Sequence, residues 1–325
     1  MGRLSNYIPA LRYGHKIYPE DMAGVVGRPH VGETLYVDAD NGSDSAGGRT
    51  WEDAFQTLEK AEENVTSDKY DTVIVAPEGT SGTAETATVT WDKNHAAVIG
   101  ASAPVGISQR ARIVTTTDSV DPCHTISGAG NTFANLQFAT FQASNDVLVN
   151  LTGSRNYFSN VHFAGIGHAT AGDDSTARCL VIDGGQENFF ENCTFGLDTV
   201  MRSTTNATLE FANSASRNVF INCRFIMAAD NVGPNHVLFT GTSSIDRWVQ
   251  FHDCTWYAFW TNDSDKITHV IDMEAQTATG HVLLTGHQTV IGADDWEATN
   301  SGNLYLEPHT ATNTAIGLAI NPSVS

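Results

Sequence analysis

The sequence of 325 residues is poor in basic side chains, with 17 Lys and Arg against 37 Asp and Glu and a formal charge of −20. Because nucleic-acid binding depends on cations that neutralise phosphates, this deficit argues against a nucleic-acid partner. The sequence has no apolar run of about eighteen residues, so we expect no membrane span. Residues 1–9 lack the apolar core of a signal peptide, and we expect folding in a cytoplasm.

A repeat stands out against this background. The pattern Asn-x-Phe-x-Asn-x-x-Phe occurs four times, beginning at residues 131, 156, 188 and 218, and a degraded fifth copy spans residues 249–256. The second aromatic residue recurs at intervals of 25, 32, 30 and 31 residues, which is typical of a solenoid. Each copy alternates as a strand does, and a second alternating run comes before most copies: 147–151, 180–183, 208–211, 236–239 and 269–272. No helical periodicity follows residue 66, so we predict an all-β coil of parallel strands, a β-helix.

Stacked coils place equivalent residues about 4.8 Å apart, in columns. We expect an interior column of rings formed by Phe133, Phe158, Phe190, Phe220 and Phe251. A polar column at a turn is predicted for Asn135, Asn160, Asn192, Asn222 and Asp253. We interpret this column as a structural ladder that satisfies turn backbone groups, although a sugar-binding ladder is the alternative.

The five cysteines are predicted to be buried free thiols. One internal column comprises Cys193, Cys223 and Cys254, while Cys123 and Cys179 align with each other at a different position. Free buried thiols are consistent with a reducing compartment. No Cys-x-x-Cys occurs, and although His236 and His269 can be placed on neighbouring coils, we expect no metal and no cofactor.

The residues before the repeat predict an entrance to the solenoid. Residues 35–38 and 71–76 are expected strands, and Thr50 and Asp53 are the expected cap of a helix. One face of that helix would carry Trp51, Ala54, Phe55, Leu58, Ala61 and Val65.

Four segments carry a resemblance: Tyr36-Val-Asp38, Asn41-Gly-Ser-Asp44, Trp51 to Ala61 and Val73 to Gly79. They resemble the entrance to the right-handed parallel β-helix of the pectate-lyase-like superfamily, in which a helix caps the open end. The resemblance covers roughly residues 34–300. It implies the fold but no single activity, because the superfamily includes lyases, hydrolases, epimerases, phage tailspikes and non-enzymatic virion proteins.

The expected organisation has four parts: an extended N-terminal attachment arm (1–33), entrance strands with the capping helix (34–100), the β-helix coils (101–310) and a C-terminal tail (311–325). Residues 1–30 hold four bases and two acids, a balance of +2, so the remainder carries −22. We expect the arm to bind a partner through Arg3, Tyr7, Leu11, Arg12, Tyr13, Lys16, Tyr18 and Arg28. The alternative is that it wraps its own solenoid.

Catalytic candidates are few. The resemblance implies one of two active sites. A lyase site would have carboxylates that hold calcium on neighbouring coils beside an Arg or Lys base, and a hydrolase site would have short Asp, His and Arg motifs on successive coils. The sequence contains neither set of motifs in the required order. If the chain is an enzyme, the candidates are the doublets Asp173-Asp174 and Asp294-Asp295. Both lie in turn-like sequence about four coils apart, where Asp is expected for backbone reasons. Arg155, Arg217 and Arg247 are predicted to form an exterior column instead of supplying a base.

These observations predict a non-enzymatic structural protein of a phage particle, a capsid decoration (cement) or fibre-base subunit. We expect a homotrimer made in the host cytoplasm and carried on the virion, with major capsid, tail or portal subunits as partners. Two alternatives stay open. One is a tailspike-like lyase or hydrolase acting on host surface glycans, and the other is a bacterial surface adhesin, which the missing signal peptide disfavours.

Overall fold

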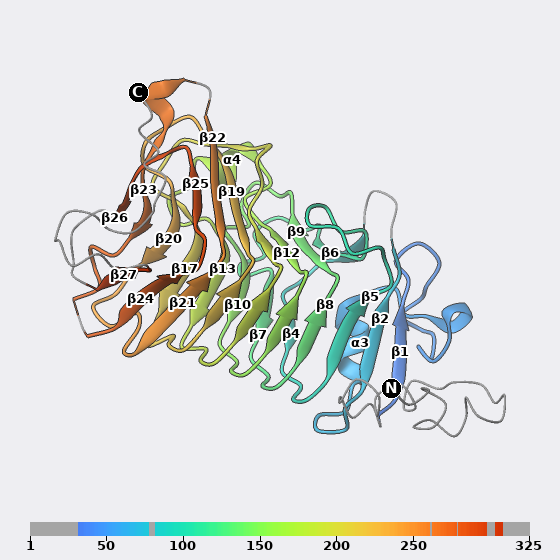
Figure 1. Cartoon of the computed structure of the whole chain (residues 1–325). Helices are drawn as coiled ribbons and strands as arrows, with labels where there is room; N and C mark the ends of the chain where they lie inside the picture. The colour runs from blue at the N-terminus through green and yellow to red at the C-terminus, as the bar shows by residue number, and fades with distance from the viewer. Residues whose placement is uncertain (1–31, 78–81, 261, 278, 298–302, 308–325) are drawn as a thin grey trace, which may run out of the picture.

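The computed structural model describes residues 32–77, 82–260, 262–277, 279–297 and 303–307 (Figure 1). Three sheets of parallel strands wind around one core and form a right-handed parallel β-helix, as the repeat predicted. The predicted arm, except for residues 32 and 33, and the predicted tail fall outside the described residues. No helix in the described ranges is long and apolar enough to span a membrane.

From β2 to β26, each coil contributes one strand to each sheet, and β1 and β27 extend sheet A at its two ends. Sheet A contains β1 (Thr34–Val37), β2 (Thr72–Val75), β5 (Ala97–Gly100), β8 (Thr132–Ala134), β11 (Tyr157–Ser159), β14 (Phe189–Glu191), β18 (Val219–Ile221), β21 (Trp248–His252), β24 (His281–Thr285) and β27 (Leu304–Leu306). Sheet B contains β3 (Thr83–Glu85), β6 (Arg112–Thr115), β9 (Gln137–Thr140), β12 (His162–Ala164), β15 (Thr194–Phe195), β19 (Arg224–Ala229), β22 (Thr255–Trp260) and β25 (Thr289–Ile291), with β16 (Met201–Arg202) beside β19. Sheet C contains β4 (Val89–Trp91), β7 (His124–Ile126), β10 (Val147–Leu151), β13 (Arg178–Asp183), β17 (Ala207–Ala212), β20 (Asn235–Phe239), β23 (Ile267–Asp272) and β26 (Ala293–Glu297).

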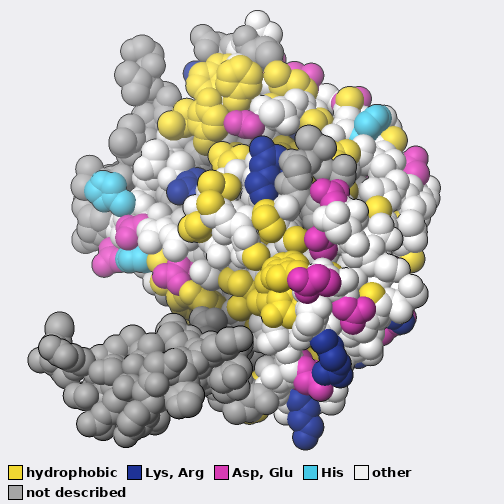
Figure 2. Space-filling view, turned by 90° about the vertical axis from the view of Figure 1, so that its right-hand side faces the viewer, with side chains coloured by type: hydrophobic (Ala, Val, Ile, Leu, Met, Phe, Trp, Pro, Cys, Tyr) yellow, Lys and Arg dark blue, Asp and Glu magenta, His cyan; other side chains and the backbone are white. Residues whose placement is uncertain are grey.

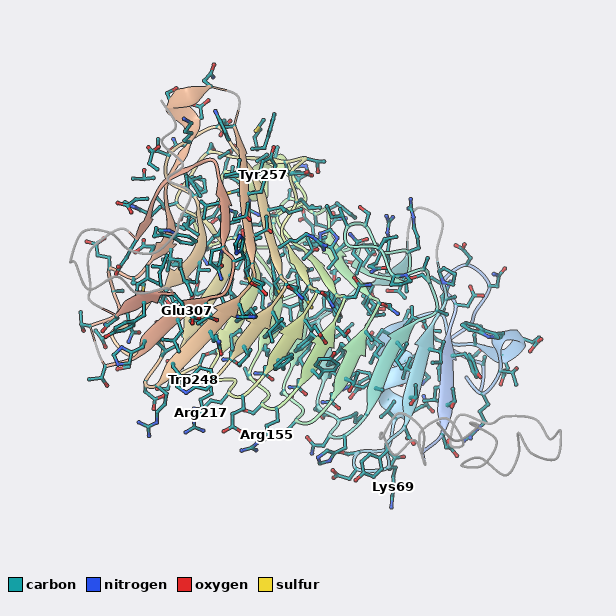
Figure 3. All side chains as sticks on the ribbon, in the orientation of Figure 1. Lys69, Arg155, Arg217, Trp248, Tyr257 and Glu307 are labelled. Atoms are coloured by element: carbon teal, nitrogen blue, oxygen red, sulfur yellow. The ribbon has the colours of Figure 1, made fainter. Side chains whose placement is uncertain are left out.

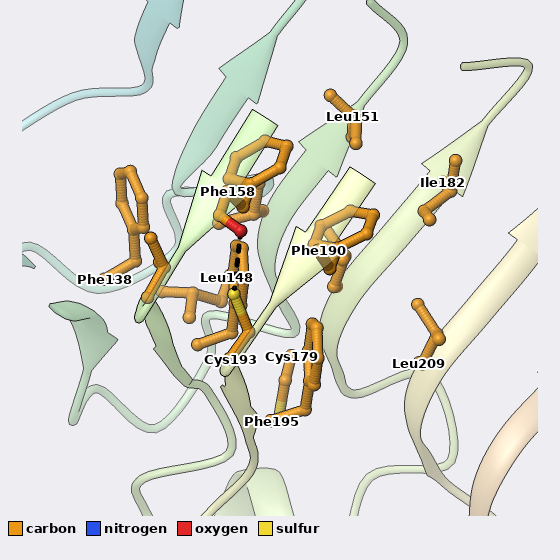
Figure 4. Packing of buried hydrophobic residues seen from close by; sticks show 14 of the residues in the cluster. Phe138, Leu148, Leu151, Phe158, Cys179, Ile182, Phe190, Cys193, Phe195 and Leu209 are labelled. Atoms are coloured by element: carbon orange, nitrogen blue, oxygen red, sulfur yellow. Dashed lines mark hydrogen bonds between the residues drawn. The ribbon is translucent and has the colours of Figure 1, made fainter. Parts of the chain in front are cut away.

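The interior is built from stacked aromatic rings. The predicted column from Phe133 to Phe251 is buried, and its neighbouring ring centroids lie 4.5 to 5.0 Å apart. The second aromatic residue of each repeat forms a parallel column from Phe138 to Trp256, with centroids 4.2 to 5.9 Å apart. The two columns meet edge to face, as at Phe190 and Phe195, which is a favoured arrangement of aromatic quadrupoles (Figure 4).

The predicted thiol column is also confirmed. All five cysteines are free and buried. Cys193 donates to the backbone carbonyl of Phe158 at 3.4 Å, and Cys223 and Cys254 make the same contact one and two coils further along (Figure 4). The thiols therefore link strands of the core as weak donors.

The two asparagines of the repeat have different roles. The second one lies at the predicted turn, where Asn135, Asn160, Asn192, Asn222 and Asp253 all adopt φ between +52° and +56°. In this left-handed conformation Asn and Asp are the best tolerated residues after Gly. The first asparagine, to which the sequence reasoning gave no role, forms a buried ladder of Asn131, Asn156, Asn188 and Asn218. Along it, each side-chain oxygen accepts from the backbone N–H of the preceding asparagine at 2.9 Å.

The prediction of one continuous capping helix over residues 50–65 is wrong. The chain forms a short 3₁₀ helix, η2 (Trp51–Asp53), then an extended segment, then α3 (Leu58–Asn64). Phe55 pairs with Val37 as an isolated bridge to β1, and this pairing interrupts the helix. Thr57 caps α3, whereas Thr50 makes no side-chain cap. α3 packs on β1, β3 and β4, the first strands of the three sheets, so it does cover the entrance of the solenoid.

Two more short helices interrupt the coils. They are α4 (Ala169–Gly172) and η3 (Asp263–Asp265). Neither was expected after residue 66, because a single turn of helix is too short to leave an amphipathic period in the sequence.

Candidate functional site

The candidate site is a groove of about 450 Å³ on the outer face of sheet C. In the second halves of β10, β13 and β17, core residues alternate with outward residues, and outward residues of these strands line the groove. Its lining residues are Asp121, Pro122, Val147, Asn150, Thr176, Arg178, Val181, Asp183, Glu210 and Thr240.

An ion pair lies in the groove. Arg178 Nε donates to Glu210 Oε2 at 2.6 Å, and the two side chains are only 7% and 16% exposed. The Arg178 Nη1 group also donates to the carbonyls of Ser175 and Ala177. The other carboxylate oxygen, Glu210 Oε1, accepts from the hydroxyl of Thr240 at 2.9 Å. Both oxygens of Glu210 are therefore engaged, and the bonds connect three consecutive coils.

Carboxylates with opposite pKa shifts border one end of the groove. Burial, with the nearby charges of Asp146 and Asp174 adding to it, raises the pKa of Asp121. Hydrogen bonds from the hydroxyl and backbone N–H of Thr176 lower the pKa of Asp174. Two carboxyl groups whose pKa values are displaced in opposite directions are suited to act as an acid and a base.

The groove also holds one unsatisfied polar atom. Asn150 Oδ1 is buried and has no hydrogen-bond partner within the protein. Such an acceptor can receive a donor from a ligand or a water. Across the described ranges, no group of three His, Cys, Asp or Glu side chains is arranged to hold a metal ion.

The two predicted aspartate doublets are far apart, as expected. β26 lies four strands from β13 in sheet C, which corresponds to roughly 19 Å. Asp173 ends α4 and accepts from the hydroxyl of Ser203, while Asp174 borders the groove.

The second doublet was wrongly placed in a turn. Asp294 and Asp295 are exposed residues within the strand β26. The strand was missed because its pattern is not alternating: both aspartates face solvent between the buried residues Ala293 and Trp296.

The predicted column of arginines is correct for two members. Arg155 and Arg217 both bind Glu187, which lies on the coil between them, at 2.7 and 2.5 Å. Arg247 is not part of this column, because Arg217 lies opposite Trp248 (Figure 3). The sequence contains this difference: Arg155 and Arg217 come three residues before the Phe column, and Arg247 comes four before it.

His236 and His269 lie on neighbouring strands but are not opposite each other. Val237 pairs with Ile271, so His236 lies opposite Val270, while His269 pairs with Asp295. Burial lowers the pKa of His236 to about 3, and neither ring nitrogen has a partner. An isolated interior imidazole of this kind is not a metal site.

Sequence reasoning missed Asp121, Asn150, Asp183 and the Arg178–Glu210 pair. Only half of a signal was present for the pair. Glu210 is the charged member of the alternating run 208–211 and takes an outward position. Arg178 lies two residues before the inward Leu180, so alternation alone would place it inward and does not pair it with Glu210.

The comparisons support the fold. By sequence, the chain matches no protein-family profile and no curated protein. A pectin methylesterase in complex with a hexasaccharide is similar in structure, with 14% identity, a TM-score of 0.53, and coverage of 88% of this chain and 93% of the other. Pectate lyase Pel9A is 13% identical with a TM-score of 0.55, and the match covers 85% of this chain and 74% of the lyase. ORF18 of Geobacillus virus E2 is 12% identical with a TM-score of 0.52, and the match covers 85% of this chain and 54% of ORF18. At these identities the likeness establishes the pectate-lyase-like β-helix fold alone.

Proposed function

We propose that this chain is a non-enzymatic structural protein of a phage particle, a capsid decoration or fibre-base subunit that assembles as a homotrimer. In this proposal residues 1–33 attach it to other virion proteins, such as capsid, tail or portal subunits. The similarity to a protein of Geobacillus virus E2 supports a place among phage proteins.

One observation carries the proposal: the polar groups in the middle of the groove stabilise the solenoid itself. Glu210 binds Arg178 and Thr240 on the coils before and after it, so both of its carboxylate oxygens take part in bonds that hold neighbouring coils together. Asp183 likewise accepts from Asn213 on the next coil. A rigid rod with its side chains bonded from coil to coil suits a spacer or brace on a particle.

Attachment can be tested on purified particles of the phage that carries the gene. Mass spectrometry should find the full-length protein in the virion. Deletion of residues 1–30 should leave a folded protein, with an unchanged β-rich circular dichroism spectrum, that no longer sediments with particles. Absence from purified virions would refute the proposal, and unfolding on deletion would refute the attachment role of the arm.

A second candidate function is binding and cleavage of an acidic or esterified glycan in the groove. The opposite pKa shifts of Asp121 and Asp174 and the unsatisfied Asn150 oxygen favour it. The test is incubation with pectin, polygalacturonate and bacterial capsule, followed by assays for reducing ends, unsaturated ends and methanol. Turnover that Asp121→Asn abolishes and Asp294→Asn leaves intact would overturn the structural proposal.

A further inference from the structure

The strands of sheet A carry almost no formal charge. The chain has 37 acidic residues, yet the ten strands of this sheet contain one carboxylate, Glu191, and no Lys or Arg. The hydroxyl of Tyr157 binds that carboxylate. Depletion of charged residues is a feature of the centre of protein interfaces.

The outer face of this sheet carries a row of mainly apolar side chains. The strand registers align six outward residues on successive strands: Tyr157, Phe189, Val219, Gln250, Leu283 and Tyr305. Five of them are half-buried and Tyr305 is 41% exposed, whereas the inward residues beside them, except Leu304, are buried in the core. Sheet A runs across the whole described solenoid from β1 to β27 (Figure 1).

We propose that this face is the surface through which copies of the chain associate, side by side with their solenoid axes parallel. The inference rests on the proposed homotrimer and adds the surface that forms it. A second copy fits because it presents the same row with the same spacing of about 4.8 Å, so that each strand can meet its equivalent.

Electrostatics is compatible with a second copy on this face. Two molecules with a charge of −20 repel each other, and the repulsion is weakest where carboxylates are absent. At one margin of the sheet, Arg155, Glu187 and Arg217 form a row of alternating sign (Figure 3). Arg155 is 71% exposed there, so it can reach a carboxylate of a neighbouring copy.

The size of the face is compatible with a stable contact. Ten strands span about 43 Å, and strands of three to five residues are roughly 10–16 Å long, which gives on the order of 400–700 Å² per copy. With the flanking turns, the area approaches the roughly 800 Å² per partner of standard interfaces.

The test measures the mass of the full-length protein by sedimentation velocity and compares two substitutions. Val219→Glu introduces a carboxylate into the face, and Tyr257→Glu introduces one at a half-buried outward position of sheet B. We expect the wild type to sediment as an assembly of 34.9 kDa chains. Val219→Glu should weaken association at least tenfold, and Tyr257→Glu should leave it unchanged. A monomeric wild type, or equal effects of the two variants, would overturn the inference.

The parallel arrangement has its own test, because the native cysteines are all buried and an introduced surface thiol is the reactive one. Thr132→Cys and Tyr305→Cys lie near opposite ends of the row. Each should cross-link to itself under mild oxidation, and a mixture of the two should give few mixed pairs. Mixed pairs alone would indicate antiparallel copies and refute the arrangement. A dimer would retain the inferred surface and refute the trimer.

Discussion

Arg178 Nε and Glu210 Oε2 lie 2.6 Å apart across β13 and β17, at a point where both side chains are nearly buried. The pair fixes neighbouring coils to each other and at the same time occupies the groove in which a catalytic group would have to lie. Its strength therefore bears on both stability and function. Removing one partner of a buried ion pair is costly because the other charge is left without compensation.

Glu210→Ala should lower the free energy of unfolding by about 3 kcal/mol, near the low end for buried pairs because Arg178 keeps its two carbonyl acceptors. The matched control is Arg155→Ala, since Arg155 is 71% exposed and its pair with Glu187 should contribute less than about 1 kcal/mol. Urea unfolding monitored by circular dichroism measures both. Equal losses would show that the buried pair does not stabilise the stacking of coils.

The two asparagines of one repeat should respond differently to substitution. Asn188→Ala removes the acceptor of the buried Asn156 N–H and should cost about 1–3 kcal/mol. Asn192→Gly keeps the left-handed turn, where φ is +56°, and should change stability by less than about 1 kcal/mol. Thermal unfolding of the two variants compares them. A larger loss for Asn192→Gly would mean that the turn side chain, not the buried ladder, holds the coils together.

The fold was predictable because the same sequence motif recurs in successive coils. A single Phe at position 190 says little, but Phe190 recurs with Asn188 and Asn192 at the same spacing in four coils, and only stacking satisfies all copies together. The capping helix was predicted with the wrong extent because Phe55 fits a helical period and also a strand pairing. Its contact with Val37 on β1, a tertiary interaction, decided between the two.

The groove was less predictable because its residues come from different coils of unequal length. Arg178 and Glu210 are 32 residues apart, and the length of each coil must be known before their side chains can be placed together. The doublets Asp173-Asp174 and Asp294-Asp295 attracted attention through adjacency in sequence. In a solenoid, a site is formed by residues that are neighbours on adjacent coils. Asp174 borders the groove because it lies beside Thr176 and near Asp121.

The carboxyl group of Glu85 should make stability depend on pH. Burial raises its pKa from 4.5 to about 7, although the backbone N–H of Leu58 at the start of α3 binds it. Between pH 4.5 and 7 the folded protein holds a proton that the unfolded chain has released. Rising pH therefore destabilises the fold in this window, by about 3 kcal/mol in total.

Glu85→Gln removes this titration. Compared with the wild type, the variant should lose about 3 kcal/mol less of its unfolding free energy between pH 4.5 and 8. Urea unfolding at a series of pH values measures the difference, and the buried histidines cancel because both proteins contain them. Parallel pH profiles would show that Glu85 is ionised in the fold at pH 5.

His236 should act in the opposite direction. Its imidazole is fully buried near Phe225 and Trp256, and burial, assisted by the charge of Arg202, lowers its pKa to about 3. The unfolded chain binds a proton there below about pH 6.5, whereas the folded protein does not. Stability is therefore lost as pH falls from 6.5 towards 3, by about 1.4 kcal/mol per pH unit for this group.

His236→Leu should abolish that loss and leave the protein at least as stable as the wild type at pH 7, because the two ring nitrogens without partners are removed together with their desolvation cost. His236→Gln separates the two effects. It does not titrate, so it should show the same flattened profile below pH 6.5, but it keeps buried polar atoms and should be less stable than His236→Leu at pH 7. Chemical unfolding from pH 4 to pH 7 compares the three proteins. If His236→Leu loses stability with falling pH as steeply as the wild type, the imidazole is protonated, and therefore partnered, inside the solenoid.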